Sequence, residues 1–179
     1  SLANSSNDNQ VERFNAACAK VKAATHEMDE LIKNLLSYAV MGKRVKKNEP
    51  IDIGAVFKER FELLCADETI ELKVNDIPIV YGDERMIVHV VDNLLSNAIK
   101  FSRKSEPNTI TVSHDTNKEE HVIKVADNGI GFNTKDSNVL FEIFQRADNA
   151  AATVGTGVGL AIVKRIISRH GGRIWAEGK

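Results

Sequence analysis

The sequence is poor in the residues that mark disulfide-stapled or fibrous proteins. It contains two cysteines, three prolines and one tryptophan in 179 residues, and aromatic residues make up 6%. The cysteines, Cys18 and Cys65, are far apart and too few for a disulfide framework, so we expect free thiols in a reducing compartment. Hydrophobic residues at 42% and charged residues at 27% are typical of a folded globular chain.

Neither charge nor hydrophobicity is concentrated in the chain. With 24 basic and 25 acidic residues, the formal net charge is −1, which gives no overall field to attract nucleic acid or an anionic membrane. The richest apolar runs, 86–91 and 160–167, are interrupted by His89 and Lys164, so no helix of about 18 apolar residues is expected. We therefore predict a cytoplasmic chain without a signal peptide, and leave open whether it belongs to a membrane-bound sensor.

A heptad pattern follows a polar start. Residues 1–10 are rich in Ser and Asn, and we expect them to be mobile. From Val11 to Gly42, weakly to strongly apolar residues recur at alternating spacings of 3 and 4, which is typical of a long helix that needs a partner. The pattern predicts a helical stem over 11–47. A helix bundle or dimer stem is favoured over a helix packed on its own domain.

Mixed helix and strand patterns follow Pro50. Asp83 is a good N-cap for a helix predicted over 84–101. The glycine-rich segment 127–159 is predicted to be irregular, and a loop of this length is usually functional. Periodicity predicts helices over 54–66, 84–101 and 159–170, and strands over 70–74, 77–81, 109–114, 121–126 and 173–176.

The helix over 84–101 carries a polar stripe opposite its apolar side. His89, Asn93 and Asn97 are four residues apart, and Lys100 continues the same face. An amide oxygen is a hard ligand suited to Mg²⁺, and a lysine supplies a positive charge to phosphate. The alternative is a solvated helix face, although asparagine is a poor helix former.

Two glycine-rich segments add to this stripe. The sequence from Asp127 to Gly131 follows a strand, where glycines allow close approach to a ligand; an ordinary Asx turn is the alternative. The sequence from Gly155 to Leu160 runs directly into a helix, so its N–H groups and the helix N-terminus can form a cradle for phosphate. It is not a Walker A loop, because Val158 follows Gly157 where that motif has lysine.

Four motifs in order resemble the boxes of sensor histidine kinases. The resemblance covers residues 50–179, and the stem resembles the second helix of the family's dimerisation and phosphotransfer hairpin. The motifs resembling the N, G1, F and G2 boxes are Asn93-x-x-x-Asn97-x-x-Lys100-Phe101, Asp127-x-Gly129-x-Gly131, Phe141-x-x-Phe144 and Gly155-x-Gly157-x-Gly159-Leu160.

This resemblance implies a fold. It is the α/β (α+β) sandwich of the Bergerat type found in the GHKL superfamily, with a mixed sheet under three helices, here preceded by the long heptad-bearing helix. The ATP-binding catalytic domain would span 50–179 and lack its last strand. It also implies ATP bound with Mg²⁺ between the N-box helix and a mobile lid.

The resemblance further implies roles for residues on the N-box helix and after it. Asn97 would hold Mg²⁺ and phosphate oxygens with Asn93 beside it, and Lys100 would contact phosphate. Phe101 would pack on the adenine. Arg146 is a candidate to neutralise γ-phosphate charge, with a surface arginine as the alternative.

The glycine-rich boxes would form the rest of the nucleotide site. Asp127 would accept a hydrogen bond from the adenine amino group, with Gly129 and Gly131 giving it room, and the F-box residues would border the nucleotide. The residues implied for the phosphate loop and the F box are Gly155, Thr156, Gly157, Val158, Gly159, Leu160, Phe141 and Phe144.

The implied activity is protein histidine kinase activity, followed by transfer to the receiver domain of a response regulator, in a homodimer. Related ATPases such as gyrase have a glutamate where this chain has Asn93, and an amide cannot act as a general base. A GHKL ATPase clamp is therefore less favoured. A degenerate, non-catalytic nucleotide-binding or scaffold module is the other alternative.

The phosphoacceptor histidine departs from the family pattern. His26-Glu27 offers the histidine and acid, but no proline follows and the position resembles the second hairpin helix. We therefore expect the acceptor to lie outside this chain, upstream. His89 stands where the family usually has glutamine. The lid over 132–154 is expected to be mobile without nucleotide.

Overall fold

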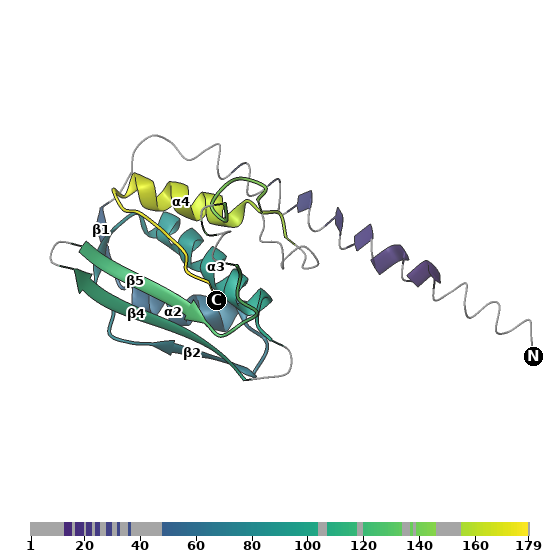
Figure 1. The fold of residues 1–179 in the computed structure, drawn as a ribbon, viewed down its shortest axis with the longest axis horizontal. Coiled ribbons are helices and arrows are strands. Elements are labelled where there is room, and N and C mark those ends of the chain that lie inside the picture. The colour runs from purple at the N-terminus through teal and green to yellow at the C-terminus, as the bar shows by residue number, and fades with distance from the viewer. Residues whose placement is uncertain are drawn as a thin grey trace, which may run out of the picture.

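The computed structural model describes most of the chain after residue 47 and part of the chain before it (Figure 1). Before residue 48, the described residues are helical and their side chains are exposed. Phe14 and Met28, for example, are 68% and 63% exposed. The stem as a paired helix stays a prediction. The described residues are 13–15, 17–19, 21–22, 24–25, 28–29, 32, 36, 48–103, 107–117, 120–133, 137, 139–145 and 155–178.

The larger part contains strands and helices that alternate along the chain. Two sheets form: β2 is parallel to β4 and β4 is antiparallel to β5, while β1 pairs only with β3. The predicted mixed sheet is confirmed. The elements are β1 (Glu49–Ile51), α2 (Ile53–Leu64), β2 (Ile70–Val74), β3 (Val80–Gly82), α3 (Glu84–Lys100), β4 (Asn108–Asn117), β5 (Glu120–Asp127) and α4 (Gly159–Arg169).

Alternation along β4 sets which face of the sheet is buried. Ile110 and Val112 are at most 1% exposed, whereas Thr109 and Thr111 between them are half-buried. This period of two directs the apolar side chains towards α2 and α3. The register pairs Ile110 with Asp127, so the buried end of the hairpin leads directly into the loop after β5.

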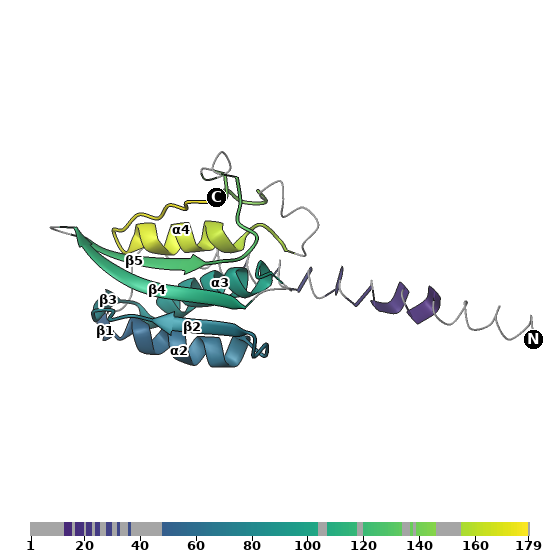
Figure 2. The same cartoon turned by 60° about the horizontal axis from the view of Figure 1, so that its bottom comes forward.

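Helix α3 lies between two hydrophobic clusters. Val91 and Leu95 pack with α2 and the sheet, whereas Val90 packs against Ile162 and Ile166 of α4. Asp83 caps the helix as predicted, because its Oδ1 accepts a hydrogen bond from the Met86 N–H at 3.3 Å. Burial of two neighbouring sides leaves the remaining side of α3 for polar residues. Figure 2 shows α3 between α4 at the top and α2 at the bottom.

The C-terminal segment corrects one prediction. Residues 172–178 form neither helix nor strand, so the strand expected over 173–176 was wrong. The segment turns back after α4 (Figure 1), and its Arg173 Nη2 lies 2.7 Å from Glu120 Oε2 of β5. A side-chain ion pair therefore connects it to β5, and Gly178 packs against Phe132.

Strand β1 was missed and β3 begins later than expected. No strand was predicted at Pro50, where the mixed helix and strand patterns were expected to begin. A proline is tolerated at a sheet edge, and β1 has only β3 as a neighbour. The strand expected over 77–81 is observed at Val80–Gly82. Among the described helices, none is long and apolar enough to cross a membrane.

Substitution of Arg60 and Asp92 by alanine, singly and together, should measure the free energy with which this ion pair couples α2 to α3. The Arg60 Nε and Nη2 atoms lie 2.6 and 3.2 Å from the two Asp92 oxygens, and this contact raises the pKa of the Arg60 guanidinium. Because the pair is only about a quarter exposed (26% and 28%), we expect a double-mutant cycle to alanine in urea to give a coupling of about 1 kcal/mol.

The exposed pair Arg173–Glu120, with side chains 69% and 54% exposed, is the matched control and should couple less. Equal coupling energies for the two pairs would contradict the assignment of Arg60–Asp92 as the tie between the helices.

Candidate functional site

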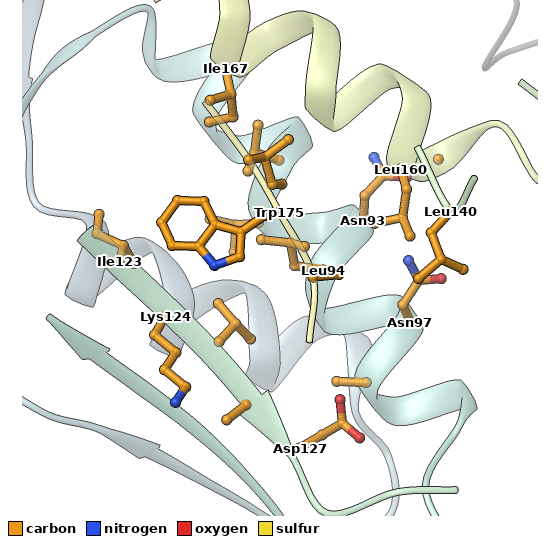
Figure 3. Close-up of a pocket in the computed structure, with 18 of the residues that line it drawn as sticks. Asn93, Leu94, Asn97, Ile123, Lys124, Asp127, Leu140, Leu160, Ile167 and Trp175 are labelled. Carbon is orange, nitrogen blue, oxygen red and sulfur yellow. The ribbon is translucent and has the colours of Figure 1, made fainter. Parts of the chain in front are cut away.

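A broad groove lies between α3, the loop after β5 and the loop before α4. It is part of an open cavity of about 2160 Å³ that also runs along β5 and the C-terminal segment, so the volume exceeds the roughly 300–1,000 Å³ of most small-molecule sites. Figure 3 shows Asn93 and Asn97 projecting from α3 towards Leu140 and Leu160, with Asp127 at the end of β5. The groove therefore brings together the polar stripe and both glycine-rich segments.

The polar stripe of α3 faces the glycine loop before α4. The Asn93 Nδ2 donates to the His89 carbonyl at 2.7 Å, which directs the Asn93 Oδ1 towards Gly159. A Cβ at Gly159 would collide with that oxygen, and a Cβ at Gly155 would collide with the Lys100 ammonium. The loop thus approaches α3 closely because these two positions carry no side chain.

The loop before α4 has the features of an anion site. Gly157 adopts φ +69°, a left-handed conformation that favours glycine. Val158 is fully buried and anchors the loop, and as N-cap of α4 it gives the helix no side-chain cap hydrogen bond. The first N–H groups of α4 are therefore not capped by that side chain and can donate to an anion. Thr156 and Leu160 of the same segment also line the groove.

The loop after β5 packs on the end of α3. Asp127 Oδ1 accepts from the Gly129 N–H at 2.9 Å, which fixes the carboxylate, and its second oxygen can accept from a ligand. The Ile130 N–H donates to the Phe101 carbonyl at 3.0 Å. A Cβ at Gly129 would overlap that carbonyl, and Gly131 adopts φ +67°. The spacing Asp-x-Gly-x-Gly is thus a packing requirement.

The two phenylalanines of the Phe-x-x-Phe motif differ. Phe141 is 7% exposed and lines the groove, whereas Phe144 is 59% exposed and has φ 65°, which is rare for a residue with a side chain. The Phe144 N–H donates to the Gly157 carbonyl at 3.0 Å, and Glu142 pairs with Lys164 of α4 at 2.9 Å. This turn is therefore held to the glycine loop and to α4.

One contributor to the loop after β5 was missed in the sequence. The Arg103 Nε donates to the Gly129 carbonyl at 3.1 Å. Arg103 lies after α3 in a charged stretch, and no periodicity connects it to a glycine 26 positions later. Arg146, His26 and most of the predicted lid lie outside the described residues, so their roles stay predictions.

The polar groups that line the groove suit a nucleotide bound together with Mg²⁺. In the described part of the chain, no group of three or more His, Cys, Asp and Glu side chains could hold a metal ion. Mg²⁺ is commonly held by few protein ligands together with substrate phosphates and water, so one amide oxygen from Asn97 beside a phosphate cradle is a suitable arrangement.

A family model and curated relatives match this chain. The model described as "Histidine kinase-, DNA gyrase B-, and HSP90-like ATPase" matches residues 82–179. The sensor-like histidine kinase SenX3 of Mycolicibacterium smegmatis is 33% identical over 98% of this chain and 47% of its own length. The phytochrome-like protein Cph1 of Synechocystis sp. is 34% identical over 84% of this chain and 20% of its own length. The chain thus spans less than half the length of these relatives.

Solved structures agree with this fold. The mycobacterial sensor histidine kinase MprB has a TM-score of 0.62 and 29% identity, over 72% of this chain and 83% of that one. Full-length ShkA, solved in complex with AMPPNP, has a TM-score of 0.69 and 25% identity, over 84% of this chain and 32% of that one. This chain belongs to the histidine kinase-, DNA gyrase B- and HSP90-like ATPase family, and it carries the catalytic ATP-binding domain of a sensor histidine kinase.

Proposed function

We propose that the groove binds ATP with Mg²⁺ and presents the γ-phosphoryl group for transfer to a histidine that lies outside this chain. The observation that carries the proposal is the meeting of three features at one groove: the amide and ammonium stripe of α3, the carboxylate after β5 and the glycine loop before α4. The carboxylate suits an exocyclic amine, and the other two suit phosphate and a hard cation.

The residues divide between the two ends of the nucleotide. Asp127 accepts from the adenine amino group, and Phe101 packs on the ring. Lys100 and the N–H groups of 155–160 neutralise phosphate charge, while Asn97 supplies an oxygen for Mg²⁺ and Asn93 lies beside it. When bound, Mg²⁺ supplies charge neutralisation at the phosphates. Arg146 adds a further positive charge at the γ-phosphate.

Transfer to a protein acceptor is favoured over hydrolysis. Water attack needs a group that takes a proton, and an asparagine amide has no such basicity. Asn93 is directed towards Gly159, where the phosphate loop runs into α4, so the α3 side chain that meets this end of the loop is not a base. The chain would then act in a homodimer, with the receiver domain of a response regulator as the final acceptor.

Substitution of Asp127 by asparagine should weaken ATP binding about 10- to 100-fold, in line with loss of one charged hydrogen bond. The amide oxygen would stay with the Gly129 N–H, so the NH₂ group would face the adenine amino group and repel it. The measurement is calorimetry with ATP, with and without Mg²⁺, and with GTP. Asp76→Asn, an exposed carboxylate outside the groove, is the control. Equal ATP affinity in Asp127→Asn and wild type would contradict the role of Asp127.

Gly129→Ala should lower ATP affinity more than Gly155→Ala. The new methyl at Gly129 meets the Phe101 backbone carbonyl, which cannot move without the loop, whereas the methyl at Gly155 meets the flexible end of Lys100. We expect a loss of about tenfold or more for Gly129→Ala, measured by the same calorimetry after circular dichroism has shown a folded protein. A greater loss in Gly155→Ala would contradict this account of the loop.

Incubation of the chain with γ-labelled Mg-ATP should give no acid-labile, alkali-stable label. The only motif-like histidine, His26, lacks the proline of the family pattern. Acid-labile label that disappears in His26→Gln would show that the acceptor lies in this chain and would contradict the proposal on that point.

A further inference from the structure

Three side chains to which the motifs assign no role form a clasp between α3, β4 and the loop after β5. They are Arg103, Asn108 and Asn128, and we use "the clasp" for these three. Each hydrogen-bonds to backbone groups of a neighbouring segment and so acts where no strand ladder joins the segments.

Asn108 closes the connection between α3 and β4. Its Oδ1 accepts from the Arg103 N–H at 2.9 Å, and its Nδ2 donates to the Arg103 carbonyl at 2.7 Å. The amide thus binds both backbone groups of one residue, as a neighbouring strand would. Asn108 is only 4% exposed, so neither group of this side chain could be left unpaired without a desolvation cost.

Asn128 makes a similar pair of hydrogen bonds, from the loop after β5 to the backbone at the start of β4. Its Oδ1 accepts from the Thr109 N–H at 2.8 Å, and its Nδ2 donates to the Pro107 carbonyl at 3.1 Å. Asn128 immediately follows Asp127, so these bonds join the loop after β5 to the start of β4. The side chain of Arg103 completes the clasp through its bond to the Gly129 carbonyl.

The clasp therefore surrounds the proposed adenine end of the groove. Asp127 and Gly129 lie on one side of it, and Phe101 lies on the other, two residues before Arg103. The direct contacts between these sides are the Ile130–Phe101 hydrogen bond and the close approach of Gly129. Without the clasp, the distance between the Asp127 carboxylate and Phe101 would depend on those contacts and on the β4–β5 ladder, which ends at the pair Ile110–Asp127.

We propose that Arg103, Asn108 and Asn128 are positioning residues that hold Asp127 at a fixed place relative to Phe101, and that they thereby set the affinity and selectivity of the site for adenine. The proposal rests on the proposed function, because it assumes that adenine binds between these two residues. The clasp acts on the base end only; the phosphate loop and the stripe of α3 are held by other contacts, such as that of Asn93 with His89.

Asn108→Asp tests the proposal with a change of one atom. A carboxylate would face the Arg103 carbonyl and repel it, whereas a protonated carboxyl can donate to that carbonyl and accept from the Arg103 N–H, as asparagine does. Burial raises the pKa of a carboxyl at such a position, so protonation is reached at mildly acidic pH. The charged side chains of the adjoining segments include Arg103 and Asp127, which are the same in the variant and in wild type.

The experiment compares ADP binding by the variant and by wild type at about pH 7.5 and about pH 5.5, which bracket the titration of a raised carboxyl. We expect the variant to bind ADP roughly tenfold more weakly than wild type at the higher pH and within roughly threefold of it at the lower pH. Tripolyphosphate affinity should equal that of wild type at both values. A general structural defect would weaken the binding of both ADP and tripolyphosphate. If the ratio of the variant's ADP affinity to that of wild type is the same at both pH values, the proposal is overturned.

Arg103→Met provides a second test if Asn108→Asp does not fold. It removes the donor to Gly129 while keeping the aliphatic stem, and Arg173→Met, a change at an exposed arginine paired with Glu120, is the matched control. We expect weaker ADP binding and a smaller preference for ATP over GTP only in Arg103→Met, with unchanged tripolyphosphate binding. Wild-type selectivity in Arg103→Met would overturn the proposal. Failure of folded wild-type protein to bind ADP would instead contradict the proposed function.

Discussion

The burial of α3 on two of its sides is the constraint on which the rest of the structure depends. Leu95 and Val91 pack into the cluster with α2 and the sheet, and Val90 packs into the cluster with α4. Since a helix has 3.6 residues per turn, these two contacts fix the direction of every other side chain on it. Asn93, Asn97 and Lys100 are left on the remaining side, so the hydrophobic core orients the polar groups of the groove.

Features that depend only on residues close together in the sequence were predicted correctly. The bounds of β2 match the alternation, Asp83 caps α3, and α4 begins at Gly159 as the glycine loop predicts. The polar stripe was predicted for the same reason, because i, i+4 spacing on a helix needs no knowledge of the fold. The glycines were identified as sites of close approach, and their neighbours, Phe101, Lys100 and Asn93, are themselves in the N-box motif.

Several features that depend on contacts between distant parts of the chain were not predicted, although the mixed sheet was. Strand β1 contains Pro50 and exists because β3 lies beside it. The segment expected as a strand over 173–176 forms no ladder and contacts β5 through the side chain of Arg173. Arg103 and Asn108 gave no signal, since their partners are backbone groups whose positions follow only from the packing of α3 against β4 and β5. The backbone conformation of Phe144 likewise could not be predicted, because it goes with a hydrogen bond to Gly157 of the glycine loop.

The hydrogen bond from Phe144 to Gly157 makes the turn and the glycine loop a single mechanical unit. Both residues have positive φ, and for Phe144 that conformation costs energy that the surrounding contacts must offset. A ligand held by the loop therefore also stabilises the turn. The consequence is thermodynamic: part of the binding free energy is used to favour the conformation of the turn, so the turn and the loop become ordered together.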